Sequence, residues 1–537
     1  MIRTTVFSLS HRVRLLIGLL GSLAVLAGSM GVGWLAPASV LRTLPLFDLV
    51  RTSRAAVVLC TFLLAAGLLL LLFAWLSLGL ALRPNARTRK RTRANAPSPL
   101  RQVVASTIVW AAPLIVALPL FSRDMFAYLG QGRILVAGLD PYTDTMADVP
   151  GWFEAGVDIK WAETVTPYGP LFVLLARIVV VATSWLPMEA ALIGVRLLAV
   201  AGLAMVAYYG WRIARLRGFN EAAVLWAVAC SPLVLMNFVL AGHNDALMLG
   251  LIVAGVYWAM RDRPILATVL VTAAIGIKPI AMIALPIIGI IWAGSTATWG
   301  ALIRRWAAVA GLALVGLLGL GLGLGVGIGW VAGLGTPIEI GSWYSIPRIV
   351  SLFARDFGPG LGLDGDVART AVVRIFLFVG CLVAAYLVTV KRRSDPLWLL
   401  AGVFSALVLF SPLQHPWYGL WLITLFGIAG LGRAWQVRLL IYVTAFLMFV
   451  GISGEQVDLI ERLRADASIP IVYGWIGVIG IVLIVAAFEF ELFRRFTRPG
   501  LPLPMLARAT PADSDGDAHA AAAGTQPGRD VPPTVQS

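Results

Sequence analysis

The chain alternates between long apolar runs and short polar connections over most of its length. Runs of about 17 to 25 apolar residues can cross a bilayer as helices. The pattern therefore predicts an all-α polytopic membrane protein of about 14 transmembrane helices. The predicted spans cover residues 15–36, 56–82, 102–121, 190–212, 221–240, 246–260, 264–279, 281–293, 306–333, 373–391, 396–411, 418–432, 438–453 and 470–491.

The polar connections divide the chain into three parts. Residues 1–100 contain two predicted helices, the first interpreted as an uncleaved span, and a basic loop. Residues 101–498 form the main membrane domain, with a long polar loop at 123–168 and a short apolar run at 169–187. The tail at 499–537 is rich in proline, alanine and aspartate, which is typical of disorder.

The distribution of charge sets the orientation of the predicted helices. Only 13% of the 537 residues are charged, whereas soluble domains carry about 25%. The net charge of +15 comes from short basic clusters between apolar runs, which indicates a membrane protein and no nucleic-acid partner. The loop at 83–101 has seven basic residues and no acid, so we expect it in the cytoplasm. The loop at 123–168 has seven acids against three bases, so we expect it on the outer face.

Two apolar segments do not fit a simple alternation of spans. A full span at 169–186 would place the basic residues after position 211 outside, so we interpret it as a juxtamembrane or re-entrant helix. Lys278 and Pro279 divide another apolar stretch into two half-length helices. With both interpretations, the two ends of the chain are cytoplasmic.

Asp124 lies where a predicted span meets the outer loop. Ionisable residues near membrane spans are costly to keep there and are candidates for function. Partial burial is expected to raise the pKa of Asp124 and suit it to general-base catalysis. The alternative, an interfacial carboxylate paired with Arg123, stays open.

Aromatic residues gather at three predicted turns on the outer side. Tyr142 follows Asp140-Pro141, Tyr168 follows Pro167, and His415, Trp417 and Tyr418 surround Pro416. Aromatic rings can stack on sugar faces, and tyrosine hydroxyls can bond sugar hydroxyls. Anchoring in the aromatic belt of the membrane is the alternative.

His243, Asn244 and Asp245 stand in succession between two spans. Asn244 and Asp245 can cap free amides of a helix while His243 faces a cavity. A structural role stays open, and so does a divalent metal, although no second carboxylate or histidine follows at ligand spacing.

Two cationic residues are candidates for binding phosphate. Lys278 in its apolar run requires an anionic partner, either a lipid-linked phosphate or a protein carboxylate, unless it extends to the interface. Arg348 is a second candidate because a guanidinium matches two phosphate oxygens at once.

The motifs SRDMFAYLGQG, GLDPY, PYGPLF, GHNDALMLGLIVAG, IKP and HPWY together resemble actinobacterial polyprenyl-phosphate-mannose-dependent α-1,6-mannosyltransferases. The resemblance covers roughly residues 100–490, and the N-terminal helix pair also fits. These enzymes are multipass GT-C glycosyltransferases of lipomannan and lipoarabinomannan synthesis. The resemblance implies a GT-C-type bundle with a large first catalytic outer loop, in the plasma membrane with the active site on the outer (periplasmic) face.

The resemblance implies that Asp124 is the catalytic base. We predict transfer of mannose, with inversion, from polyprenyl phosphate mannose to the 6-hydroxyl of a mannan acceptor. These residues indicate no definite cofactor and leave a divalent metal open, but a carboxylate pair that bridges a metal is not predicted because Arg123 precedes Asp124. The predicted donor-phosphate ligands are Lys278, Arg348 and His243, and the predicted substrate-binding residues are Arg123, Tyr142, Tyr168, Asn244, Asp245, His415, Trp417 and Tyr418.

Two other functions compete with this prediction. A secondary transporter would also have many helices, a broken helix and intramembrane charge. However, transporters usually place ionisable residues near the midplane, whereas this chain gathers them at outer junctions. A transferase that uses another polyprenyl-phosphate sugar, such as arabinose, is the second alternative.

Overall fold

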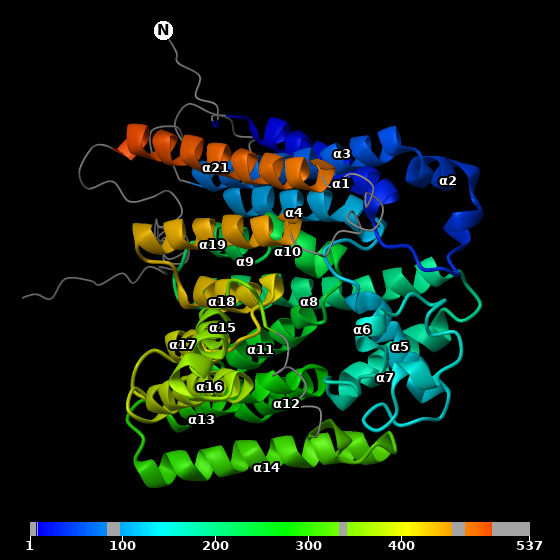
Figure 1. Cartoon of the computed structure of the whole chain (residues 1–537). Helices are drawn as coiled ribbons and strands as arrows, with labels where there is room; N and C mark the ends of the chain where they lie inside the picture. Colours follow the sequence, from blue (N-terminus) through cyan, green and yellow to red (C-terminus); the bar gives the residue numbers. More distant parts are fainter. Residues whose placement is uncertain (1–6, 8, 83–96, 332–340, 454–467, 497–537) are drawn as a thin grey trace, which may run out of the picture.

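The computed structural model describes residue 7 and residues 9–82, 97–331, 341–453 and 468–496 (Figure 1). This described part contains helices and no strand. Most of the predicted cytoplasmic basic loop, the short outer loop after residue 453 and the predicted disordered tail lie outside the described residues.

Seven helices in the described ranges are long and apolar enough to cross a membrane. Each overlaps a span predicted from the sequence, which confirms a polytopic all-α membrane protein. They are α1 (His11–Val32), α3 (Arg54–Ala81), α8 (Met188–Leu216), α14 (Trp299–Gly323), α16 (Gly365–Thr389), α19 (Ala434–Ser453) and α21 (Ser468–Phe496).

The predicted span at 221–240 is bent by 43°. It consists of α9 (Glu221–Val228), α10 (Pro232–Val234) and η3 (Leu235–Leu240), and η3 is wound as a π-helix. The bend follows from Pro232, which has no N–H to continue the helix of α9. The hydroxyl of Ser231 accepts a hydrogen bond from the Val234 N–H at 3.3 Å and so caps the new helix.

The remaining predicted spans coincide with shorter apolar helices. The expected break at Lys278 is present, because Lys278 is extended (φ −142°, ψ 117°) and Pro279 starts a new 3₁₀ turn. These helices are α4 (Pro99–Ile115), α11 (Asp245–Ala259), α12 (Pro264–Ile277), η4 (Pro279–Ala284) with α13 (Leu285–Ala293), α17 (Pro396–Leu409) and α18 (Pro416–Ala429).

Polar connections contain further short helices. Between α1 and α3 lie η1 (Val40–Thr43) and α2 (Pro45–Thr52), and before α16 lie α15 (Ile346–Phe357) and η6 (Gly358–Leu361). The predicted outer loop contains α5 (Asp124–Val136), η2 (Met146–Asp148) and α6 (Ile159–Ala162), and the short apolar run after it forms α7 (Pro170–Ala182).

The N-terminal helix pair is joined to the main domain by two tryptophans. The rings of Trp75 in α3 and Trp226 in α9 stack with centroids 4.4 Å apart. Each indole N–H donates to the other residue's carbonyl, at 3.0 and 2.8 Å. Because both side chains are fully buried, this reciprocal contact satisfies both polar groups and fixes α3 against α9.

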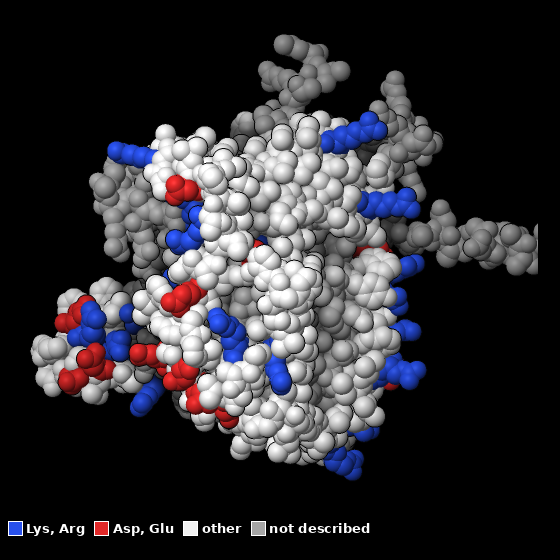
Figure 2. Space-filling model, turned by 90° about the vertical axis from the view of Figure 1, so that its right-hand side faces the viewer, with Lys and Arg blue, Asp and Glu red and all other residues white. Residues whose placement is uncertain are grey.

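The predicted outer loop folds against α7 at the right-hand side of Figure 1, where α5, α6 and α7 lie together. A small apolar core of its own supports it, made of Ala127, Ile134, Met146, Val149, Val157 and Ala162. Figure 2 shows this side of the molecule, where acidic side chains gather among basic ones, whereas one edge carries mainly Lys and Arg. The orientation predicted from the loops stays a prediction.

The start of α7 meets the break after α12. The Gly169 N–H donates to the Ile277 carbonyl at 3.2 Å, and a Cβ at Gly169 would lie 2.5 Å from the Gly276 carbonyl oxygen. Only glycine permits this approach, which brings Tyr168 beside Lys278. With 13 residues, α7 is about 20 Å long, short of the roughly 30 Å of a bilayer core, so its juxtamembrane placement stays a prediction that its length favours.

Candidate active site

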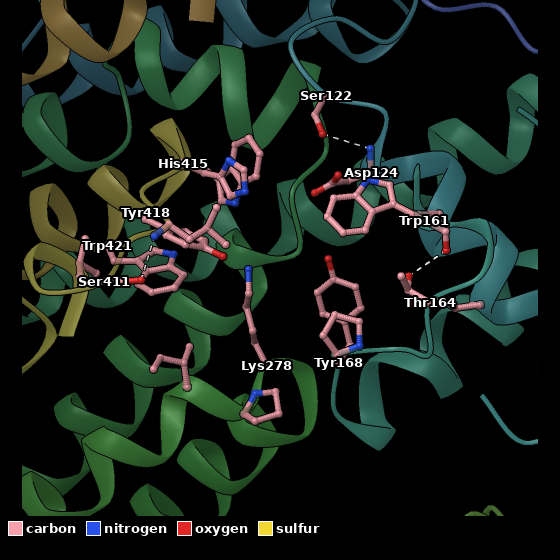
Figure 3. Close-up of a pocket in the computed structure, with 18 of the residues that line it drawn as sticks. Ser122, Asp124, Trp161, Thr164, Tyr168, Lys278, Ser411, His415, Tyr418 and Trp421 are labelled. Carbon is pink, nitrogen blue, oxygen red and sulfur yellow. Dashed lines mark hydrogen bonds between the residues drawn. The ribbon is translucent and has the colours of Figure 1, made fainter. Parts of the chain in front are cut away.

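A cavity of about 630 Å³ opens between the outer loop and the helices on either side of Lys278 (Figure 3). One part of its wall is polar and aromatic and includes Asp124, Lys278 and His415. Another part is apolar, formed by Ile280, Met282, Ile283, Phe404, Leu407, Val408 and Leu413. The cavity can therefore take a molecule that combines a polar, charged group with a hydrocarbon chain.

Asp124 is the first residue of α5 and faces the cavity, with 21% of its side chain exposed. Its N–H donates to the Ser122 hydroxyl at 3.0 Å. One carboxylate oxygen, Oδ2, lies 3.4 Å from Nδ1 of the fully buried His243 and 3.5 Å from the hydroxyl of Tyr128. Phe121, three residues before it, has φ 67°, an unusual conformation for a side chain of this size. The turn into the catalytic candidate is therefore strained and held by its surroundings.

The electrostatics of Asp124 differ from the expectation. Burial favours the neutral acid, as anticipated, but the hydrogen bond from His243 and the nearby His415 and Lys278 outweigh it. The pKa of Asp124 is consequently lowered to about 2, so the expectation of a raised pKa is wrong. Asp124 is ionised at neutral pH and is ready to accept a hydrogen bond from a substrate hydroxyl.

Arg123 does not pair with Asp124 as the alternative interpretation required. Its guanidinium lies 3.3 Å from Asp158 Oδ2, donates to the Gly156 carbonyl at 3.0 Å, and stacks over Trp34 at 4.3 Å. Asp124 is thus left free of Arg123, and Arg123 lines the cavity from the outer-loop side.

His243 forms part of a stack of three rings. The centroid of its imidazole lies 3.8 Å from that of the Trp417 ring, and the Trp417 ring also stacks with His415 at 4.2 Å. Gly242 allows the turn into His243, because it has φ +64° and a Cβ there would lie 2.6 Å from Met125 Sδ. His415 and Trp417 line the cavity, and burial lowers the pKa of His415 to about 4. His415 is therefore neutral at neutral pH.

Lys278 reaches the cavity from the break between α12 and η4. Its Nζ lies 2.8 Å from Oδ1 of Asp245, which also accepts the indole N–H of Trp421 at 2.8 Å. The rings of Tyr418, Trp421 and Tyr168 surround the ammonium at 5.1, 5.4 and 5.8 Å. The anionic partner required by Lys278 is thus a protein carboxylate, and the ammonium keeps two further protons for a ligand.

The other predicted site residues have different placements. Tyr168 lines the cavity, and its carbonyl accepts the hydroxyl of the buried Tyr142 at 3.0 Å, so Tyr142 supports the wall. Asn244 is buried beside His243, makes no capping bond, and has no hydrogen-bond partner for its side chain in the described part. Arg348, at the start of α15, is not among the lining residues, and its role as a phosphate ligand stays a prediction.

Four important residues were missed in the sequence. Tyr128 follows Asp124 by four residues and Trp421 follows Trp417 by four, a spacing that places both pairs on one helix face. That signal was available. Trp34 reaches the cavity from the connection after α1 and Trp161 from the short helix α6, and the sequence contains no local signal for either contact. Within the described ranges, no group of three or more His, Cys, Asp or Glu side chains is arranged to hold a metal.

The fold and the cavity together define a multi-pass membrane protein with an ionised carboxylate and an ammonium facing one amphipathic cavity. Residues 15–294 match the profile of the alpha-(1->6)-mannopyranosyltransferase N-terminal domain, and residues 356–465 match the MptB C-terminal domain. The chain belongs to the alpha-(1->6)-mannopyranosyltransferase family.

Similar proteins support this membership over most of the chain. It is 30% identical to alpha-(1->6)-mannopyranosyltransferase A of Mycobacterium tuberculosis over 418 residues, 75% of this chain and 78% of the relative. It is 26% identical to alpha-(1->6)-mannopyranosyltransferase A of Corynebacterium glutamicum, over 73% of this chain and 83% of the relative. It is 27% identical to alpha-(1->6)-mannopyranosyltransferase B of the same organism, over 81% of this chain and 76% of the relative. Membership of a transferase family argues against the transporter alternative.

Proposed function

We propose that the chain transfers mannose from polyprenyl phosphate mannose to the 6-hydroxyl of a mannan acceptor, with inversion at the anomeric carbon. The reaction would take place at the outer face of the plasma membrane, in lipomannan and lipoarabinomannan synthesis. The observation that carries the proposal is one cavity that holds Asp124, Lys278 and an apolar wall. The mannose named in the family and in its relatives favours mannose over arabinose.

The donor fits the two kinds of wall. Its hydrocarbon chain would lie along the apolar residues of η4 and α17, such as Ile283 and Leu407, where hydrophobic burial is favourable. Its phosphate would lie near Lys278, whose pairing with Asp245 orients the ammonium. The surrounding rings of Tyr418 and Trp421 exclude water and strengthen the interaction between ammonium and phosphate.

Asp124 serves as the base of a single displacement. The acceptor hydroxyl forms a bond to C1 of mannose while the bond from C1 to the phosphate oxygen breaks. The hydroxyl proton passes to Asp124, and the polyprenyl phosphate leaves with one additional negative charge. Lys278 stabilises that charge, because a fixed cation in a site of low polarity favours the transition state over the donor. The hydrogen bonds of His243 and Tyr128 hold the Asp124 carboxylate in place.

The test uses the full-length chain in lipid nanodiscs. It is incubated with labelled polyprenyl phosphate mannose and a short α-1,6-mannoside, and the linkage of the product is determined. We expect an elongated α-1,6-mannoside and release of polyprenyl phosphate. Transfer from a nucleotide sugar but not from the lipid-linked donor, or a β-linked product, would overturn the proposal.

A further inference from the structure

Trp161 lies at the outer-loop end of the cavity, away from the apolar wall proposed for the donor. Figure 3 shows Tyr418 and Trp421 on one side of the cavity, Lys278 and Tyr168 in the middle, and Trp161 with Thr164 on the other side. The indole of Trp161 points into the cavity, toward Asp124. The two ends therefore have different aromatic walls, one from membrane helix α18 and one from the outer loop.

The geometry of an inverting displacement assigns the two ends to different substrates. The incoming oxygen and the leaving phosphate must stand on opposite sides of C1. Lys278 marks the side of the phosphate, so the acceptor lies beyond Asp124, on the side of Trp161. This assignment agrees with access, because α6 belongs to the polar outer loop whereas the apolar wall is formed by η4 and α17.

The chemistry of Trp161 suits a sugar acceptor. The face of an indole is apolar and carries a partial negative charge, so it attracts the polarised C–H groups on one face of a hexose. Asp158 and Thr164 in the same loop also line the cavity and can bond hydroxyl groups at the edges of the ring, while the Lys160 ammonium lies over the Trp161 ring, 5.7 Å from its centroid. An aromatic face with polar groups around it is what a neutral polysaccharide requires.

A chain of contacts holds Trp161 at a fixed place relative to the base. Asp158 Oδ1 accepts the Lys160 N–H at 3.0 Å and so starts α6, which carries Trp161. Asp158 Oδ2 pairs with Arg123 at 3.3 Å, and Arg123 directly precedes Asp124 in the chain. The Thr164 hydroxyl donates to the Trp161 carbonyl at 2.8 Å and closes the turn after α6.

We propose that Trp161 is the stacking platform for the terminal sugar of the acceptor, and that the Arg123–Asp158 pair positions it beside Asp124. The inference rests on the proposed function and adds the acceptor subsite to it. The mannoside acceptor would bind at the outer-loop end of the cavity from the aqueous side, and the donor would bind at the membrane end.

The experiment measures initial rates of the full-length chain with donor and mannoside varied independently. For Trp161→Ala we expect an acceptor KM raised about tenfold, equivalent to about 1.4 kcal/mol, with the donor KM unchanged. Trp161→Phe retains an aromatic face and should stay near the wild type, whereas Trp161→Leu retains only apolar volume and should behave like the alanine variant. If the alanine variant does not fold, the comparison of Trp161→Phe with Trp161→Leu still tests whether an aromatic ring is required at this position.

Matched variants separate stacking from general damage to the loop. Phe153→Ala removes an aromatic residue of the same loop that is 48% exposed and does not line the cavity, so its acceptor KM should equal that of the wild type. Asp158→Asn retains a capping oxygen but loses the charge toward Arg123, so it should raise the acceptor KM by a smaller factor.

Two kinds of failure are distinguishable. An unchanged acceptor KM in Trp161→Leu, or equal increases in donor and acceptor KM, would overturn the platform while leaving the transferase intact. Absence of transfer by the wild-type chain from the lipid-linked donor would instead overturn the proposed function.

Discussion

Replacing Asp124 with asparagine tests the proposed mechanism most directly. The change keeps the shape of the side chain and removes both the negative charge and the ability to accept a proton. A positioned base typically contributes about 10² to 10⁴-fold to a rate. Because the surroundings lower the pKa of Asp124 to about 2, it is a weak base, and we expect the lower part of that range, about 10² to 10³-fold in kcat. That loss corresponds to about 3 to 4 kcal/mol of transition-state stabilisation.

The pH dependence gives a second, independent expectation. A carboxyl with a lowered pKa stabilises the folded state above its ordinary pKa of 3.8, and this stabilisation is lost as the pH falls through about 2. Between pH 5 and 9, Asp124 therefore stays ionised, so its titration should produce no acidic limb in the pH–rate profile. The ratio of the wild-type rate to the Asp124→Asn rate should therefore be constant between pH 5 and 9.

The assay is mannose transfer to a short α-1,6-mannoside, measured in nanodiscs alongside thermal unfolding. Glu163→Gln serves as the control, because Glu163 is an exposed acid of the same loop that does not line the cavity. It makes the same change of charge and should keep the wild-type rate. Near-normal turnover of a folded Asp124→Asn variant would refute the role of Asp124 as base.

Three other changes test the surroundings of the site. Lys278→Met leaves Asp245 buried without its cation, so we expect a loss of activity and a loss of about 3 to 5 kcal/mol of stability. The double variant Lys278→Met with Asp245→Asn should regain stability but not activity. Recovery of both would contradict a role for the positive charge of Lys278 in the reaction. Gly242→Ala meets Met125 at 2.6 Å in addition to its positive φ, whereas Gly218→Ala, with a similar φ and open space, has the backbone cost alone. Thermal unfolding should therefore show Gly242→Ala as the less stable variant, by about 1 to 3 kcal/mol, and equal stabilities would refute the packing argument. Ile159 is 70% exposed in the outer loop, and Ile159→Cys is made in a chain in which the exposed Cys381 is replaced by serine. On intact cells, this cysteine should react with a membrane-impermeant maleimide. Labelling only after permeabilisation would place this loop, and the active site, on the cytoplasmic side.

The hydropathy pattern was sufficient for most of the helices. Each of the fourteen predicted spans coincides with a long helix, with the bent pair or with a shorter apolar helix in the described residues. The break at Lys278-Pro279 was also predictable, because a proline cannot continue a helix. The bend at Pro232 has the same local cause, but it was not predicted, although Ser231 and Pro232 interrupt the apolar run at this point.

The contacts inside the site were not predictable in the same way. The sequence suggested Asp124 as a base and Lys278 as a cation, and the structure brings both to one cavity. It also turns Arg123 away toward Asp158 and gives Lys278 the carboxylate of Asp245, 33 residues away in the chain. The sign of the pKa shift at Asp124 followed from these placements, so it could not be derived from burial alone.

The approximate positions of the apolar helices and the charge of each loop are properties of short segments, because a bilayer acts on each apolar run separately and each loop carries its own charge. The cavity depends on side chains from six or more elements whose approach is determined by packing. Trp34 and Trp161 illustrate the difference, since one follows α1 and the other lies in α6, yet both line the cavity that contains Asp124. Electrostatic interactions act across space and not along the chain, so the ionisation of Asp124 and the partner of Lys278 were decided only when the helices packed together.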